Sequence, residues 1–186
     1  VVVDPVGVGA TPTRTRVAER LVSELDVTIL NGNYGEISAL AGEEAEVRGV
    51  ESVGEYSDIA RTAVACARQY DTVVVASGEM DVVATSEEVY EINAGDPMMG
   101  NVVGTGCMLG GTLATLAGGL EDPTRAALLG TVAFGLAGEL AAGGEFGEIH
   151  GPASFNTAFK DAMAGLRTAD YADANARIKQ VLSTSN

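Results

Sequence analysis

A glycine-rich loop, Gly104-Thr105-Gly106-Cys107, opens directly into an apolar run of helix length. The first amides of a helix have no intrahelical acceptor, and together with the helix dipole they attract anions. Glycines let a phosphate approach the backbone closely, and a cysteine in the first turn can act as a base or nucleophile when its pKa is lowered there. The loop therefore indicates phosphoryl transfer, although a tight turn into a buried helix explains this segment alone about as well.

Two further segments carry oxygen ligands that suit Mg²⁺. Asn33 and Glu36 lie three residues apart, on one face at the start of a predicted helix. Asp4 follows a run of valines, and a carboxylate at the end of a buried strand needs a cation or hydrogen-bond donors. Mg²⁺ is usually held by a few protein oxygens together with water and phosphate. The alternatives are a capping box made by Asn33 and Glu36 and a turn capped by Asp4.

Other motifs narrow the choice of nucleotide site. Ser77 follows a second valine run, and its hydroxyl could contact a phosphate or belong to a simple turn. The chain has no Gly-x-x-x-x-Gly-Lys-Ser/Thr sequence, which excludes a P-loop. The glycines at 7 and 9 lack the third glycine of a dinucleotide fingerprint. His150 is the only histidine, and its place in a loop favours an incidental role.

The elements that must position these residues alternate between strands and helices, which predicts an α/β layered fold with a mostly parallel central sheet, flanked by helices, plus a small β-hairpin. Strands are predicted at residues 1–4, 27–30 and 72–76, and the hairpin at 82–85 and 89–92. Helices are predicted at residues 14–25 with Thr13 as cap, from the 31–33 turn to Gly42, and at 56–70, 105–116, 123–142, 152–166 and 171–182. Residues 43–54 and 95–106 are predicted loops, the second of them functional.

Four polar residues come just after predicted strands: Asp4, Asn31, Asn33 and Ser77. In parallel sheets the carboxyl ends of the strands meet at one edge, where ligands bind. We therefore expect these four side chains at one edge of one sheet.

Composition sets the broad class. The 186 residues, 46% of them hydrophobic, predict one domain over residues 1–186. The apolar stretch at 126–142 is interrupted by glycines and Glu139, so it predicts a buried helix and no membrane span. The formal net charge of −15 argues against nucleic acids and anionic membranes as partners.

Acidic residues far outnumber lysines, of which there are only two, Lys160 and Lys179. Such a surface is typical of proteins adapted to high salt, which screens its self-repulsion. An ordinary acidic cytosolic protein is the alternative. Cys66 and Cys107 do not form a disulfide framework, so a reducing cytoplasm is expected.

In their order along the chain, seven segments resemble hydroxyethylthiazole kinases, a branch of the ribokinase-like superfamily. They are residues 3–11, 14–15, 32–37, 77–81, 103–109, 135–141 and 151–155, with Cys107 where most of the superfamily has Asp. The resemblance implies transfer of the ATP γ-phosphoryl group to the hydroxyl of 4-methyl-5-(2-hydroxyethyl)thiazole, for thiamine synthesis.

The resemblance also implies roles for the residues above. Asp4 and Glu36 would organise Mg²⁺ with support from Asn33. The amides of residues 104–107 would form an anion hole, with Gly104 also against the substrate. Cys107 would stand at the place of the general base, its thiol partly ionised near neutrality. Ser77 matches a family Thr that contacts ATP. A homotrimer with active sites between subunits is implied in the same way.

Three departures from the family pattern follow. Asn31 stands where the family has an Arg that contacts ATP phosphate, so it would contact the nucleotide by hydrogen bonds without bringing charge. Ala153 stands where the family has Gly. Family members carry a sizeable segment before the Asp-Pro-Val-Gly strand, so we expect an N-terminally incomplete chain. The alternatives are another ribokinase-like enzyme, such as a hydroxymethylpyrimidine kinase or an ATP-dependent NAD(P)H-hydrate dehydratase, and a catalytically inactive nucleotide-binding fragment.

Overall fold

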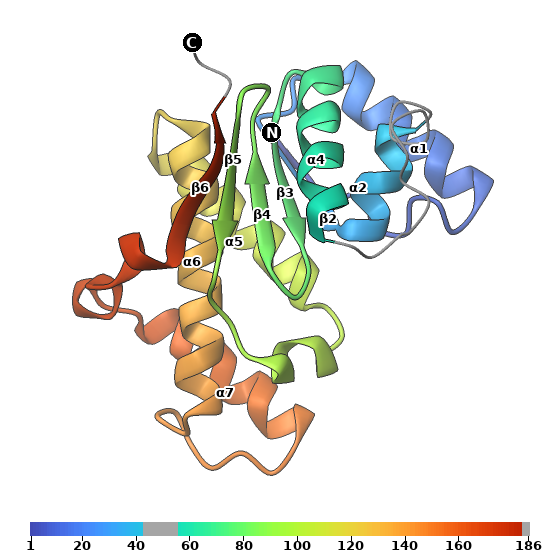
Figure 1. Cartoon of the computed structure of the whole chain (residues 1–186). Coiled ribbons are helices and arrows are strands. Elements are labelled where there is room, and N and C mark those ends of the chain that lie inside the picture. Colours follow the sequence, from blue (N-terminus) through green and yellow to red (C-terminus); the bar gives the residue numbers. More distant parts are fainter. Residues whose placement is uncertain (43–55, 184–186) are drawn as a thin grey trace.

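A six-stranded sheet with the strand order β1-β2-β3-β4-β5-β6 forms the centre of the computed structural model, which describes residues 1–42 and 56–183 (Figure 1). The predicted loop at 43–54 lies outside the described residues. The strands are β1 (Val2–Val3), β2 (Ile29–Asn33), β3 (Val73–Ser77), β4 (Asp81–Ala84), β5 (Glu88–Ile92) and β6 (Ile178–Ser183). The α-helices are α1 (Pro12–Glu24), α2 (Tyr34–Ala41), α4 (Tyr56–Tyr70), α5 (Thr105–Gly119), α6 (Pro123–Ala142) and α7 (Pro152–Gly165). Short 3₁₀ helices span Pro97–Asn101, Thr168–Tyr171 and Ala174–Arg177.

The predicted α/β class is confirmed, and the sheet is more mixed than the valine runs indicated. Strands β1, β2 and β3 are parallel, whereas β3–β4, β4–β5 and β5–β6 are antiparallel pairs. The predicted hairpin exists, but it continues the sheet beside β3 and is not a separate unit. Short connections suffice for antiparallel neighbours, so the segment from β3 to β5 needs no crossover helix.

The predicted polar helix at 171–182 is wrong. Its first part contains a 3₁₀ turn, and residues 178–183 form β6, which pairs with the edge of β5. Cross-strand contacts hold it there: the Lys179 ammonium lies 3.1 Å from the Glu91 carboxylate, and the Gln180 amide donates to Glu88 at 3.0 Å. Pairing with the edge of β5 has overridden the weak helical preference of this polar segment.

Two boundaries near the N-terminus also differ from the prediction. Thr11, not Thr13, caps α1, because Pro12 takes the first helical position, where its missing N–H costs nothing. The segment 31–33 continues strand β2 and is not a turn; its last residue, Asn33, caps α2.

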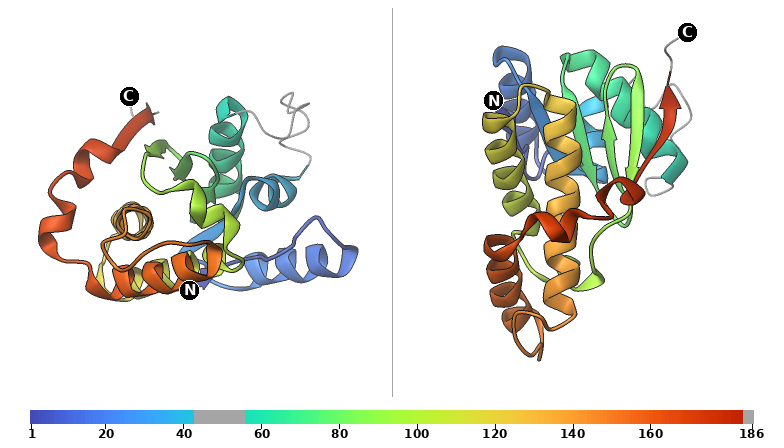
Figure 2. Two further views of the ribbon diagram at one scale, coloured as in Figure 1. Left: turned by 90° about the horizontal axis from the view of Figure 1, so that it is seen from below. Right: turned by 90° about the vertical axis from the view of Figure 1, so that its left-hand side faces the viewer.

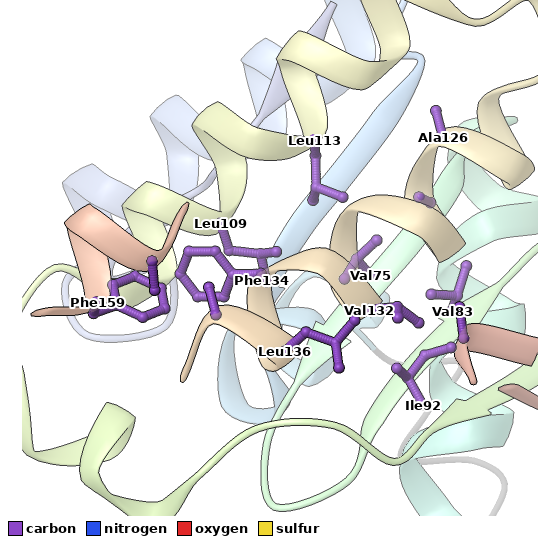
Figure 3. Close-up of a cluster of buried hydrophobic side chains, with 14 of the residues drawn as sticks. Val75, Val83, Ile92, Leu109, Leu113, Ala126, Val132, Phe134, Leu136 and Phe159 are labelled. Carbon is purple, nitrogen blue, oxygen red and sulfur yellow. The ribbon is translucent and has the colours of Figure 1, made fainter. Parts of the chain in front are cut away.

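Helices cover both faces of the sheet. Alternate strand residues point to opposite sides: Val74 and Ala76 join the cluster under α1, α2 and α4, and Val73 and Val75 join the cluster under α5, α6 and α7. The two further views in Figure 2 show α5, α6 and α7 together on one side. In Figure 3, Leu109 of α5 and Phe134 of α6 lie in this second core, beside Phe159.

Among residues 1–42 and 56–183, α6 alone is long and apolar enough to cross a membrane by length and composition. It packs against α5, α7 and the sheet, and 67% of its most apolar window is buried within the fold. The apolar composition of α6 is therefore that of a core helix.

Candidate active site

The carboxyl ends of the three parallel strands lie side by side, as the sequence predicted. Asp4 follows β1 directly, Asn33 ends β2 and Ser77 ends β3. Asn33 and Ser77 are register partners on neighbouring strands. The order β1-β2-β3 therefore sets Asp4, Asn33 and Ser77 along one edge of the sheet.

Asn31 does not belong to that edge. It pairs with Val75 inside the sheet and is only 1% exposed. Its side-chain amide donates to the carbonyl of Gly106 at 3.3 Å, while its Oδ1 has no hydrogen-bond partner among residues 1–42 and 56–183. A side chain this deeply buried does not fit the predicted contact with nucleotide phosphate. Asn31 instead supports the glycine loop through its hydrogen bond to the Gly106 carbonyl.

Glu36 forms the capping box that the sequence offered as an alternative. Its Oε2 accepts from the Asn33 amide at 2.9 Å, and the Glu36 amide donates to Asn33 Oδ1 at the same distance. Its Oε1 accepts from the Gly7 amide at 2.8 Å, which ties the turn after β1 to the start of α2. Each carboxylate oxygen keeps a second lone pair, so capping leaves capacity for a cation.

Asp4 and Cys107 interact directly. Burial raises the pKa of Asp4, a hydrogen bond with the Cys107 thiol partly opposes this, and the charge of Glu36 adds to the rise. The pKa of Cys107 is also raised, first by the negative charge of Asp4. The raised thiol pKa runs against the prediction that the helix N-terminus leaves Cys107 partly ionised near neutrality. Cys66, by contrast, is buried, which raises its pKa to about 12.

The glycine loop has the geometry of an anion site. Gly104 adopts a left-handed conformation, with φ of 97°, and precedes α5 without any side-chain cap. The Thr105 hydroxyl donates to the carbonyls of Met99 and Val102, both at 3.2 Å, and so points back into the loop. The first amides of α5 have no intrahelical acceptor, and nothing from residue 104 covers them.

A pocket of about 620 Å³ joins the ends of several elements. Ser77 lines it from the end of β3, and Thr105 and Gly106 line it from the start of α5. Leu109 and Phe134 form an apolar part of its lining, and both belong to the core in Figure 3. Its volume lies within the range of small-molecule sites.

The sequence predicted only part of one wall of this pocket. The predicted functional loop at 95–106 does line it, and the residues Asn93, Ala94, Gly95, Asp96, Pro97, Met99 and Gly100 contribute. Asp81 also lines the pocket, and sequence analysis did not single out its side chain. Asp81 Oδ1 accepts from the Gly78 amide at 3.0 Å, while burial raises the pKa of the carboxyl to about 6. The signal was present in the sequence as an acid at the start of an otherwise apolar strand.

The metal ligands predicted at Asp4, Glu36 and Asn33 lie near one another. No group of three or more His, Cys, Asp or Glu that could hold a metal occurs in the part of the chain that the structure describes. Asp4 and Glu36 are nevertheless close enough for the charge of Glu36 to raise the pKa of Asp4. Two carboxylates with one amide oxygen match the few protein ligands that Mg²⁺ takes beside water and phosphate.

Comparison with known proteins agrees with the fold and with the motifs. The sequence model of the hydroxyethylthiazole kinase family matches residues 1–169. Curated hydroxyethylthiazole kinases of Natronomonas pharaonis and Haloquadratum walsbyi are 68% and 61% identical over 99% and 98% of this chain. The chain covers 66% and 64% of those two relatives, so it spans about two thirds of their length.

A solved structure of a hydroxyethylthiazole kinase protein from Pyrococcus horikoshii is 28% identical and superposes with a TM-score of 0.78. The match covers 97% of this chain and 65% of that one. Family motifs, close relatives and fold agree over nearly all of these residues, and the chain belongs to the hydroxyethylthiazole kinase family.

Proposed function

We propose that the protein transfers the γ-phosphoryl group of ATP to the hydroxyl of 4-methyl-5-(2-hydroxyethyl)thiazole. The observation that carries this proposal is the 620 Å³ pocket, lined both by Ser77 at a strand end and by Thr105 and Gly106 at the start of α5. A strand-end hydroxyl and helix-start amides are donors for phosphate oxygens. The two curated relatives are both named hydroxyethylthiazole kinase, which supports the choice of alcohol.

The amides of residues 104–107 are proposed as the anion hole. Phosphoryl transfer has little covalent chemistry for the protein to perform, so positioning and charge stabilisation supply most of the catalysis. Fixed amides cost no reorganisation when charge develops on the transferred group. The Gly106 carbonyl is held by Asn31 and the Thr105 hydroxyl is held by Met99 and Val102, which keeps the loop in place.

Asp4 and Glu36, supported by Asn33, are proposed to hold Mg²⁺. When bound, the cation neutralises charge on the phosphates and on the two carboxylates. Glu36 is fixed by the amides of Gly7 and Asn33, so its orientation is set before any ligand arrives. Burial and the nearby charge of Glu36 raise the pKa of Asp4, so a cation beside it would favour its charged form.

Cys107 is proposed to receive the proton of the attacking hydroxyl. Its thiol is exposed at the start of α5 and contacts Asp4. The charge of Asp4 is the main cause of the raised thiol pKa, so neutralising that charge favours the thiolate. Ser77 is proposed to contact the nucleotide, and Gly104 to lie against both substrates.

The remaining expectations are proposals of the same standing. We propose a homotrimer with active sites between subunits, a cytoplasmic location, and adaptation to high salt, the last supported by the net charge of −15 and the scarcity of lysine. Light scattering of the purified protein tests the trimer; a monodisperse monomer at working concentration contradicts it.

A coupled assay of ADP release tests the proposed reaction. The protein is incubated with the thiazole alcohol, ATP and Mg²⁺ at low and at high KCl, and hydroxymethylpyrimidine serves as the competing alcohol. We expect turnover with the thiazole and a loss of about 10² to 10³ in kcat for Asp4→Asn, as for removal of one charge-stabilising group. Turnover with the pyrimidine alone overturns the substrate, and silence of the full-length protein at both salts favours a binding module.

A further inference from the structure

The pocket wall at residues 93–95 is held from outside the pocket by two charged side chains. The Arg177 guanidinium donates to the Asn93 carbonyl at 3.3 Å, and the Asn93 amide donates to the Arg177 carbonyl at 2.9 Å. The Gly95 amide donates to Glu139 Oε1 at 3.0 Å. Asn93 and Gly95 line the 620 Å³ pocket, whereas Glu139 and Arg177 lie behind them.

Glu139 and Arg177 also bind each other through two parallel hydrogen bonds. Arg177 Nη1 lies 2.6 Å from Glu139 Oε1, and Nη2 lies 2.8 Å from Oε2. The side chains are 27% and 32% exposed, so about two thirds of each is removed from water. Two-point contacts between Arg and a carboxylate fix orientation as well as distance, and partial burial makes the loss of one partner costly.

The same face of α6 is shaped to receive the wall. A Cβ on Gly135 would lie 2.7 Å from the backbone carbon of Ala94, and a Cβ on Gly138 would overlap the Met99 side chain. Side chains at these two positions would therefore push the segment 94–99 toward the pocket. Gly135, Gly138 and Glu139 belong to the segment 135–141, which sequence analysis singled out and the proposed reaction does not use.

We propose that Glu139 and Arg177 are positioning residues for the nucleotide. They fix the wall at residues 93–95 in the shape that binds ATP, and they touch neither the phosphates nor the reacting hydroxyl. This inference rests on the proposed function, because it takes the pocket to be the nucleotide site. Through Glu139 and Arg177, α6 and the C-terminal segment would help to shape the nucleotide site, although both residues lie far from the anion loop in sequence.

The test separates nucleotide affinity from chemistry and from stability. Glu139→Gln retains an acceptor for the Gly95 amide but loses the charge that Arg177 binds, and Arg177→Lys retains the charge but loses the two-point contact. For both variants we expect the KM for ATP and the Kd for ADP to rise by about tenfold or more, the loss expected for one charge-assisted hydrogen bond. The KM for the thiazole alcohol should stay within about twofold of the wild-type value, because residues 93–95 are proposed to contact the nucleotide and not the alcohol.

Lys179→Gln is the matched control. It removes the 3.1 Å pair between Lys179 of β6 and Glu91 of β5, two residues along the chain from Arg177, but this pair does not hold the pocket wall. The control should leave the KM for ATP and the Kd for ADP unchanged. ADP binding is measured by calorimetry and Tm by thermal unfolding on the same samples.

The outcomes are distinct. Unchanged ADP affinity in Glu139→Gln and Arg177→Lys, beside a wild type that binds ADP, overturns the positioning role and leaves the proposed function standing. A wild-type protein that binds no ADP overturns both. If Glu139→Gln fails to fold, Arg177→Lys decides: weaker ADP binding at a wild-type Tm supports the inference, and a lowered Tm with wild-type ADP affinity refutes it.

Discussion

Replacing Asp81 with Asn should make the protein more stable at neutral pH. Burial raises the pKa of this carboxyl from 3.8 to about 6, even though its Oδ1 accepts from the Gly78 amide. A raised pKa means that the folded chain binds the proton more tightly than the unfolded chain. Stability is therefore greatest when Asp81 is protonated, and it falls as the pH rises from about 4 to about 6. The amide of Asn is uncharged, so Asp81→Asn removes this loss.

The size of the stability difference follows from the pKa shift of Asp81. A difference of roughly two pH units, at about 1.4 kcal/mol per unit, corresponds to about 3 kcal/mol. The free energy of unfolding of Asp81→Asn, minus that of the wild type, should rise by about a third of this amount between pH 4 and pH 5 and level off near pH 7. The Asn carbonyl can still accept from the Gly78 amide, so the remaining difference at low pH should be small.

Denaturant unfolding at constant ionic strength, from pH 4 to pH 8, measures this difference directly. Glu24→Gln is the control: Glu24 pairs with Arg20 on the exposed surface of α1, with 60% of the Glu24 side chain accessible. Exposed pairs contribute less than about 1 kcal/mol, so the control difference should stay within that limit at each pH. A difference for Asp81→Asn that is flat with pH, or that falls as pH rises, refutes the reasoning.

Three further predictions concern the site and the surface. Cys107→Ala should lower kcat by about 10²-fold, the usual contribution of a general base, without changing Tm, because the thiol is exposed; Cys107→Asp should retain turnover, and its inactivity would show that the base is misassigned. Gly78→Ala should lower stability by about 1–3 kcal/mol, because a new Cβ would overlap the Tyr34 ring; a wild-type Tm would show that the ring moves freely. Molar KCl should raise the midpoint of thermal unfolding, since salt screens the charge of −15; a higher midpoint in dilute buffer would contradict salt adaptation.

The strand ends of the candidate site were predictable because their signals are local. A valine run followed by Asp4 or Ser77 marks both the strand and its last polar residue, and parallel pairing then brings the ends together. Asn33 could be assigned to a helix cap from its spacing to Glu36 alone. These features need no knowledge of distant residues.

The parts that could not be predicted depend on contacts far apart in sequence. Strand β6 exists because the edge of β5 lies beside it, 88 residues earlier in the case of Lys179 and Glu91. The wall at residues 93–95 takes its shape from Glu139 and Arg177. Asn31 was assigned to a turn because Asn-Gly-Asn is a turn sequence, whereas pairing with β3 extends the strand through it.

Cys107 shows how a correct local rule can predict the opposite direction for a pKa shift from the one that the surrounding charges produce. A helix N-terminus presents roughly half a positive charge, and sequence analysis used that charge to lower the thiol pKa. The negative charge of Asp4, then burial, and then the negative charge of Glu36 raise the thiol pKa. Asp4 follows β1 and Glu36 lies in the first turn of α2, so neither carboxylate could be weighed from residues 104–107 alone. A cation held by Asp4 and Glu36, as proposed above, would lower the thiol pKa, and this ties the proposed base to the proposed metal.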